Sequence, residues 1–170
     1  QISSNRKSAY SSYVLALAYN YPLGNYLKGE ELLKESLTYK NFINDFSYQE
    51  YRTNRALGWL NLQQGKFEEA LEYFYFAKDI QAKNILGDWA VFDIDMSLGI
   101  GYYFLEDYKN AQVYFDKSVS LMNLSNAVSD NLELASYYFL NQFKLGNFNL
   151  ITDSILNPLH SKGVHVSLND

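Results

Sequence analysis

The residues that could carry out chemistry are few in this chain. There is no cysteine, which excludes a thiolate metal site and a thiol nucleophile. The imidazoles are His160 and His165, and a gap of five residues does not bring two imidazoles onto one helical face. No motif places either histidine as the base for a serine or threonine nucleophile, as a catalytic triad requires. The sequence therefore favours neither a metal site nor nucleophilic catalysis.

Two further patterns resemble functional motifs only in part. Gly99-Ile100-Gly101 begins like a dinucleotide-binding loop, but Phe104 stands where the third glycine is needed and no strand precedes it. The paired acids Glu68-Glu69 fall in the first turn of an expected helix, where the helix dipole favours negative charge. We therefore expect no enzymatic activity, no catalytic residue and no cofactor.

Acidic side chains gather between residues 84 and 108, a window without lysine or arginine. They are Asp88, Asp93, Asp95, Glu106 and Asp107. One interpretation is an acidic patch for a basic partner. The other is a solvated face together with a helix end, and the sequence leaves both open.

Length and composition set the class of protein. The chain has 170 residues, of which 48% are hydrophobic, so it can bury a core as one domain. A net charge of −5 without long runs of one sign argues against nucleic acid and against an anionic membrane surface. No stretch approaches 18 consecutive apolar residues, so we expect no membrane insertion. The chain begins with Gln1, so we expect a fragment or a processed product, and the compartment stays open between the cytoplasm and an exported protein.

An internal repeat accounts for most of the chain. Four short sites end in an aromatic ring: Gly24-Asn25-Tyr26, Gly65-Lys66-Phe67, Glu106-Asp107-Tyr108 and Gly146-Asn147-Phe148. Their rings are spaced by 41, 41 and 40 residues. Apolar residues at three- and four-residue steps around these sites predict helices near 8–21, 25–40, 48–64, 67–84, 88–105, 108–122, 129–145 and 148–157.

Small residues in these helices indicate close packing. Leu57-Gly58 and Leu98-Gly99 lie within expected helices, where glycine costs about 1 kcal/mol relative to alanine. That cost is reasonable only where a second helix packs against the backbone. Ala70 and Ala111 stand between bulky rings and would allow the same close approach.

At these residues the pattern resembles the tetratricopeptide repeat. The matching residues are Leu57, Gly58, Gly65, Phe67, Ala70, Phe74 and Ala77 in the second unit, and Leu98, Gly99, Tyr102, Tyr108, Ala111 and Phe115 in the third. The copies are divergent: Gly29 and Ser118 replace the usual alanines, and Asn54 and Asp95 stand where the family prefers a large aromatic. The period also exceeds the usual 34 residues by six or seven, or about one extra turn in each helix.

The resemblance implies an all-α, right-handed α-solenoid of about four helical hairpins. Residues 1–170 would form a single repeat domain, with units at approximately 8–40, 48–84, 88–122 and 129–157 and a tail at 158–170. In such a stack the first helix of each unit lines a concave face. The candidate partner-binding groove comprises Arg52, Arg55, Trp59, Leu62, Asp93, Met96, Ile100, Tyr103, Leu140 and Phe143.

Alternatives exist for several groove residues. Trp59 and Tyr103 would equally suit packing between helices, and Arg52 could form an ion pair with Asp93 on the next unit. Some family members hold a terminal carboxylate with lysine and asparagine on this face. Arg55 could stand for one lysine, but Trp59 replaces the neighbouring asparagine, which argues against such a clamp.

The sequence favours a non-catalytic scaffold that binds an unidentified protein or peptide on its concave face. The alternative is a ligand- or peptide-sensing portion of a larger bacterial regulator or sensor. An enzyme accessory or catalytic domain, and a structural segment whose groove is filled by its own chain or by a second copy in a homodimer, are further possibilities.

Overall fold

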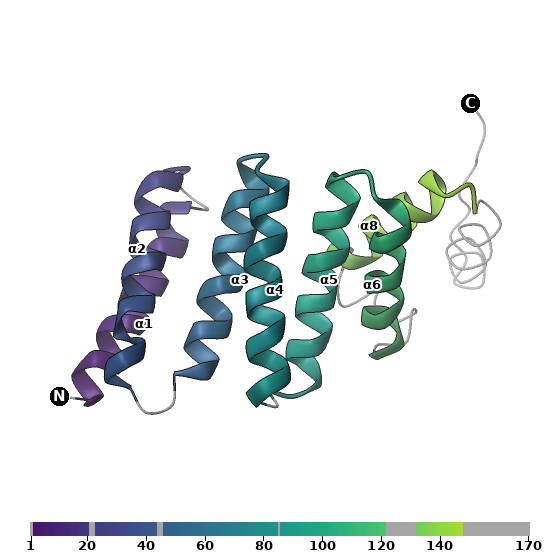
Figure 1. Ribbon diagram of the computed structural model, residues 1–170. Helices are drawn as coiled ribbons and strands as arrows, with labels where there is room; N and C mark the ends of the chain where they lie inside the picture. Colours follow the sequence, from purple (N-terminus) through teal and green to yellow (C-terminus); the bar gives the residue numbers. More distant parts are fainter. Residues whose placement is uncertain (1, 21–22, 44–45, 85, 122–131, 148–170) are drawn as a thin grey trace, which may run out of the picture.

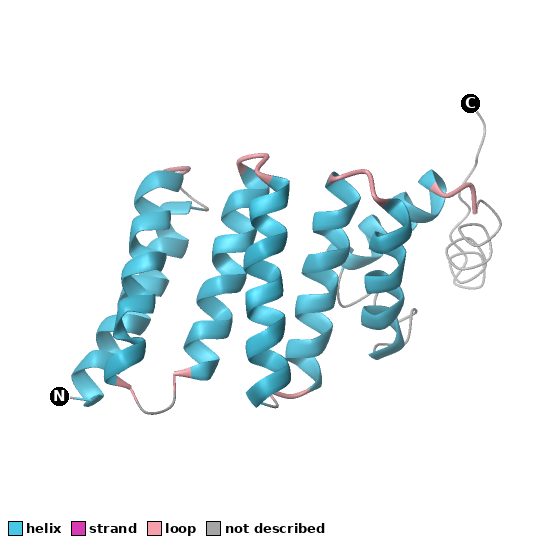
Figure 2. Ribbon diagram, viewed as in Figure 1, coloured by secondary structure: helices cyan, strands magenta, loops and turns pink. Residues whose placement is uncertain are grey.

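The protein is built from α-helices. The computed structural model describes residues 2–20, 23–43, 46–84, 86–121 and 132–147, and this part contains no strand (Figure 2). Its elements are α1 Ile2–Asn20, α2 Tyr26–Thr38, the 3-10 helix η1 Tyr39–Phe42, α3 Ser47–Gln63, α4 Phe67–Asn84, α5 Asp88–Phe104, α6 Tyr108–Leu121 and α8 Leu132–Lys144. The predicted all-α class is confirmed.

The helices pack as consecutive hairpins. The pairs α1–α2, α3–α4 and α5–α6 make the most extensive contacts, and the pairs follow one another in a row through α2–α3 and α4–α5 to α8 (Figure 1). The protein is therefore an all-α solenoid of helical hairpins, as the repeat predicts. The predicted helix at 148–157, the end of the fourth unit and the tail at 158–170 lie outside the described residues.

Helix α1 is longer than predicted. It begins at Ile2, whereas the apolar pattern placed the start near residue 8. The reason is tertiary: α1 also packs on η1 and α3, where Ala9, Ile43 and Phe46 form a small buried cluster. Packing thus extends a helix through a polar segment that carries no apolar periodicity.

The first helices lie closer to one another than the second helices do. Contacts join α1 to α3, α3 to α5 and α5 to α8, whereas the backbones of α2 and α4 approach each other much less. A cavity of about 510 Å³ on the second-helix side, lined among others by Leu37, Tyr73 and Phe76, fits this wider spacing. The first helices therefore line the inner side of the stack.

A left-handed residue marks each of the four repeat sites. The φ angles are 62° at Gly24, 73° at Gly65, 60° at Glu106 and 79° at Gly146. At the last three sites, hydrogen bonds reach back three and five residues, as from Gly65 N to Leu62 O and from Lys66 N to Asn61 O. This is the Schellman ending of a helix, which satisfies its last carbonyl groups.

The residue after the turn caps the second helix at two of these sites. The side chain of Asn25 accepts a hydrogen bond from Lys28 N, and Asp107 Oδ1 accepts one from Asn110 N. These bonds satisfy backbone donors that the first turn of a helix leaves open. The three-residue sites thus end one helix and begin the next.

Glycines within the first helices permit contact with aromatic rings. A Cβ atom on Gly58 would lie 2.3 Å from Phe74 Cε1, and one on Gly99 would lie 2.6 Å from Phe115 Cδ1. Both rings are fully buried. Each hairpin of the second and third units is therefore closed by a ring of its second helix against the backbone of its first.

Departures from the family pattern have local explanations. Gly29 replaces alanine because Asn20 Oδ1 occupies the space, 1.6 Å from where a Cβ atom would stand. Ser118 replaces alanine and donates a hydrogen bond to Phe92 O at 3.0 Å, which ties α6 to α5. Ser36, at the equivalent position of the first unit, donates to Ala9 O at 2.9 Å and ties α2 to α1.

The buried core is divided into two main clusters. One joins α1, α2 and α3 through Leu33, Leu57 and Leu60 among others. The other runs from α3 to α8, with Phe74 and Phe115 at its centre. Helix α3 contributes to both clusters, so the first hairpin is attached to the rest of the stack largely through this one helix.

Candidate partner-binding surface

An arginine surrounded by aromatic rings lies on the inner side of the first two units. The Arg52 guanidinium carbon is 4.3 Å from the ring centre of Tyr13, 5.2 Å from that of Tyr48 and 5.7 Å from that of Tyr10. Tyr48 contacts Trp89 edge-on, with ring centres 5.8 Å apart. These five residues, from α1, α3 and α5, are called the aromatic–arginine surface below.

The rings of this surface are fixed and also accessible. Tyr10, Tyr48 and Trp89 are 52%, 48% and 50% exposed. A guanidinium over the face of a ring is attracted by the π electrons, and edge-on ring pairs are favoured electrostatically. One side of each of these three rings is therefore held by the protein while the other can meet a partner, whereas Tyr13 is buried beneath Arg52.

A polar network ties the second unit to the third next to this surface. Tyr51 Oη donates to Asp93 Oδ2 at 3.0 Å and lies 3.1 Å from Ala90 O, and Arg55 Nη2 lies 2.5 Å from Asp93 Oδ1. Burial raises the pKa of Asp93, although Arg55 and Tyr51 act in the opposite direction. Burial also raises the pKa of the Tyr51 phenol, with the charge of Asp93 adding to the effect.

The predicted inter-repeat ion pair thus forms with a different arginine. Asp93 pairs with Arg55, so the expectation of an Arg52–Asp93 pair is wrong. The two arginines lie about one helical turn apart on α3 and face different neighbours. Arg52 is directed at the tyrosines of α1, whereas Arg55 is directed at α5.

Trp59 and Tyr103 are both partly buried between helices. Trp59 contacts Phe74 edge-on at 5.9 Å, and its Nε1 donates to Ser97 Oγ on the next unit at 3.2 Å. Tyr103 meets Tyr137 of α8 with ring centres 5.6 Å apart. Packing within and between units accounts for the position of both rings, and a role of either in binding stays a prediction.

The other groove candidates separate into buried and exposed side chains. Leu62, Met96 and Ile100 are buried in the core, which removes them from the lining of an open groove. Leu140 and Phe143 of α8 are 48% and 56% exposed, at the far end of the stack from the aromatic–arginine surface. The structure therefore does not bring the predicted residues together as one continuous groove.

Residues that the sequence prediction missed form much of the observed surface. Tyr10, Tyr48 and Trp89 are absent from the predicted groove. A signal for two of them exists, because Tyr48 and Trp89 are 41 residues apart and hold equivalent places in their units. Tyr48 also extends the predicted stripe of α3 by one turn, four residues before Arg52.

The repeat-signature residues lie in the core or at turns. Nine of them are buried: Leu57, Gly58, Ala70, Phe74, Ala77, Leu98, Gly99, Ala111 and Phe115. Phe67, Tyr102 and Tyr108 are partly buried, and Gly65 forms a turn. These residues therefore pack within the hairpins or form their turns.

A tyrosine network joins three helices on the second-helix side. The hydroxyl of Tyr75 is 2.8 Å from those of both Tyr102 and Tyr114, and the rings of Tyr102 and Tyr114 are stacked at 5.6 Å. The hydrogen bond with Tyr75, together with desolvation, raises the pKa of Tyr102 to about 12. The Tyr102 phenol is therefore neutral at physiological pH, and the three hydroxyl groups link α4, α5 and α6.

Three of the five carboxylates in the acidic window already have partners. Asp93 pairs with Arg55, the buried Asp95 pairs with Lys78, and Asp107 caps α6. Within the described ranges, no three His, Cys, Asp or Glu side chains converge as ligands for a metal ion. His160 and His165 lie outside those ranges. None of the described helices has the length and apolar character needed to cross a membrane.

The fold and the surface together define a class of protein, an all-α solenoid of helical hairpins with an aromatic face on its inner side. No protein-family model matches the chain. A TPR repeat-containing protein of Treponema pallidum (strain Nichols) is 34% identical over 88 residues. The match covers 52% of this chain and 10% of that much longer protein. The resemblance to the tetratricopeptide repeat is therefore confirmed, and such folds are typically non-catalytic scaffolds for protein interaction.

Proposed function

We propose that this protein is a non-catalytic scaffold that binds a protein or peptide partner through the aromatic–arginine surface. One observation carries the proposal. Three half-exposed rings from three different helices adjoin one arginine or its ring neighbour: Tyr10 and Tyr48 contact Arg52, and Trp89 contacts Tyr48 edge-on. Tyrosine, tryptophan and arginine are the residues that contribute most to binding energy at protein interfaces.

The solenoid supports this role because it makes the surface stiff. The rings of Tyr10, Tyr48 and Trp89 belong to α1, α3 and α5, which contact one another along the inner side of the stack. Side chains already held in place lose little conformational freedom when a partner binds. The ordering cost of binding then falls mainly on the partner, which suits a flexible segment.

Single alanine substitutions test the proposal. Tyr48→Ala and Trp89→Ala would each remove a half-exposed ring without emptying the core. The purified chain would be used to capture partners from a lysate, and each captured protein would then be produced and its Kd measured by calorimetry. We expect each substitution to weaken binding at least tenfold, or about 1.4 kcal/mol.

Phe76→Ala on α4 is a matched control. Phe76 is 60% exposed on the second-helix side and also loses an aromatic ring. It should leave the Kd unchanged. Equal binding by the wild type and both surface variants, with thermal unfolding also unchanged, would contradict the proposal.

A further inference from the structure

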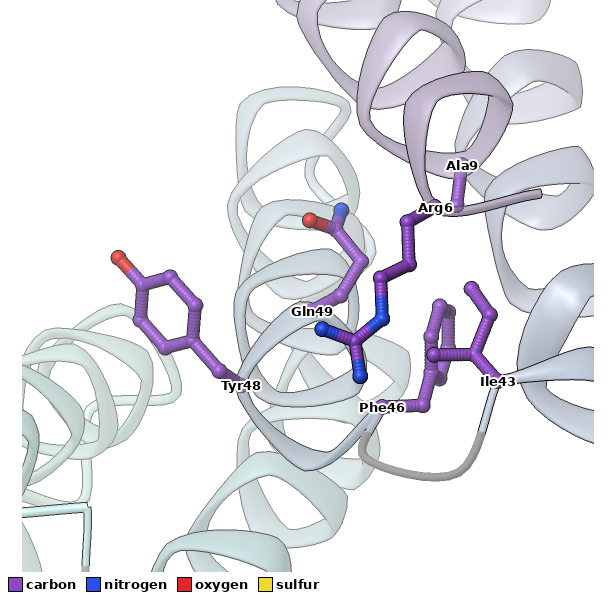
Figure 3. A pocket seen from close by; sticks show the side chains of 6 residues that line it. All are labelled: Arg6, Ala9, Ile43, Phe46, Tyr48 and Gln49. Carbon is purple, nitrogen blue, oxygen red and sulfur yellow. The ribbon is translucent and has the colours of Figure 1, made fainter. Parts of the chain in front are cut away.

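A small cavity opens beside the aromatic–arginine surface. Its volume is about 280 Å³, and it lies where the start of α1 meets the end of η1 and the start of α3. Its lining residues are Arg6, Ala9, Ile43, Phe46, Tyr48 and Gln49. Figure 3 shows the Arg6 side chain between Gln49 and Phe46, with Ile43 on the other side of Phe46 and the Tyr48 ring directed away from them. Tyr48 belongs both to this cavity and to the aromatic–arginine surface.

The inner part of the cavity is apolar and well supported. Ala9, Ile43 and Phe46 are each less than a tenth exposed and form a cluster of their own. Gln49 Nε2 donates to Thr53 Oγ1 at 3.1 Å, which fixes its amide at the wall. The cavity is therefore suited to receive one apolar side chain between a buried floor and a polar rim.

Arg6 gives the rim of the cavity a positive charge, and the Arg52 guanidinium lies against the lining residue Tyr48, although the whole chain is acidic. Six basic side chains of the first two units have carboxylate partners: Lys28, Lys34, Lys40, Arg55, Lys78 and Lys83. Among the described residues of these two units, Arg6, Lys7, Arg52 and Lys66 have no such partner, and the first three lie on α1 or α3. Lys7 holds the place in α1 that Tyr48 holds in α3, one period later.

Nearby acids do not cancel this charge. Glu50 follows Gln49 on α3, but its Oε1 lies 2.5 Å from Lys40 Nζ and is thus already paired. Arg52 contacts rings, which attract a cation without neutralising it. The charge on the rim therefore remains available to an anionic partner.

We propose that this cavity anchors an acidic peptide segment of the partner. One apolar side chain of the segment enters over Ala9, Ile43 and Phe46, and flanking carboxylates pair with Arg6 and Arg52. This inference rests on the proposed function and adds the chemistry of the partner to it. The apolar floor distinguishes such a segment from a phosphate-rich nucleic acid, which would meet the charges but leave the floor uncovered.

Selection from a random dodecapeptide library on the whole chain tests the proposal. We expect the selected peptides to be enriched in aspartate and glutamate next to leucine, isoleucine or phenylalanine. The most enriched peptide would be synthesised with a fluorescein label and its Kd measured by fluorescence polarisation. Replacing its apolar anchor by alanine should weaken binding about tenfold, because the buried floor then loses its contact.

Two variants of the protein test the rim. Arg6→Gln and Arg52→Gln each remove one charge but keep a long polar side chain. Each should raise the Kd of the labelled peptide about tenfold, as expected for the loss of a charge-assisted hydrogen bond. Lys109→Gln on α6 is the control with the same charge change, and its Kd should stay that of the wild type. The wild-type Kd should also rise between 50 and 300 mM NaCl, since added salt screens the partly exposed pairs.

The outcomes separate this inference from the proposed function. If selected peptides depend on Tyr48 and Trp89 but not on Arg6 or Arg52, the acidic anchor is wrong and the binding surface stands. Selected peptides without acidic residues, or tighter binding of a labelled single-stranded RNA dodecamer than of any peptide, would also overturn the inference. A selection that yields no binding peptide contradicts both proposals. Unchanged thermal unfolding of the two arginine variants assigns a lost affinity to the site.

Discussion

Replacement of the hairpin glycines by alanine tests how the solenoid is held together. In Gly58→Ala the new Cβ atom would lie 2.3 and 2.4 Å from two carbon atoms of the Phe74 ring. In Gly99→Ala it would lie 2.6 Å from two carbon atoms of the Phe115 ring. Carbon atoms in contact prefer about 3.5–4.0 Å, so either change creates an overlap of roughly 1 Å.

Two opposing effects decide the sign of the change. Alanine is favoured over glycine inside a helix by about 1 kcal/mol. Overpacking of a buried site costs about 1–3 kcal/mol. Phe74 and Phe115 have no exposed surface, and Phe74 is also held edge-on by Trp59, so neither ring can withdraw freely. We expect overpacking to win by up to about 2 kcal/mol, which lowers the Tm by up to about 8 °C in a chain of this length.

Urea unfolding followed by circular dichroism measures the effect, with Glu72 as the reference site. Glu72 is exposed in the middle of α4, so the difference between Glu72→Ala and Glu72→Gly gives the intrinsic preference in this protein. The expected value is about 1 kcal/mol in favour of alanine. If Gly58→Ala and Gly99→Ala increased stability by that same amount, the rings would not be packed on these backbones and the argument would be refuted.

Two further predictions concern the third turn and the inter-repeat network. Glu106→Gly should raise the free energy of unfolding by about 0.5–1 kcal/mol. The left-handed conformation costs a residue with a side chain about 1–2 kcal/mol, which glycine avoids. The greater entropy of glycine in the unfolded state offsets part of that gain. An unchanged Tm for this variant would contradict that reasoning. Because the pKa of Asp93 is raised in the folded state, the folded protein holds the Asp93 proton more tightly than the unfolded protein does. The contribution of Asp93 to stability should therefore fall as pH rises from the ordinary aspartate pKa through the raised value. Urea unfolding between pH 4 and pH 7 should show this fall in the wild type and a smaller one in Asp93→Asn, and equal slopes would count against it.

The repeat made most of the fold predictable. The turns at Gly65 and Gly146 carry glycine where the chain needs a positive φ, and Phe74 and Phe115 mark the rings that close the hairpins. Such features depend on short-range sequence patterns, so one chain suffices to detect them. Glu106 shows the limit of residue type alone, because its turn was recognisable only from the spacing of its neighbours.

The candidate surface was less predictable because burial depends on neighbouring units. A stripe drawn on α5 by periodicity placed Met96 and Ile100 in a groove, yet every residue from 94 to 101 is buried. Helix α5 is covered by α3 and α4 on one side and by α6 and α8 on the other. Its nearly continuous apolar sequence is the signal of that enclosure, whereas an exposed stripe would require polar residues beside it.

The division of the core through α3 has a consequence for the cooperativity of the chain. The cluster of α1 and α2 is completed mainly by side chains of α3, such as Ala56, Leu57 and Leu60, with Tyr73 of α4 packed against it. The first hairpin can therefore open with little disruption of the cluster that runs from α3 to α8. Backbone amides of α1 and α2 should then exchange with solvent by local opening, ahead of those in α4 and α5. A ligand held between α1 and α3 would oppose that opening by about 2.7 kcal/mol at a hundred times its Kd. Occupancy of the proposed surface and the order of the first hairpin would thus be a single linked equilibrium.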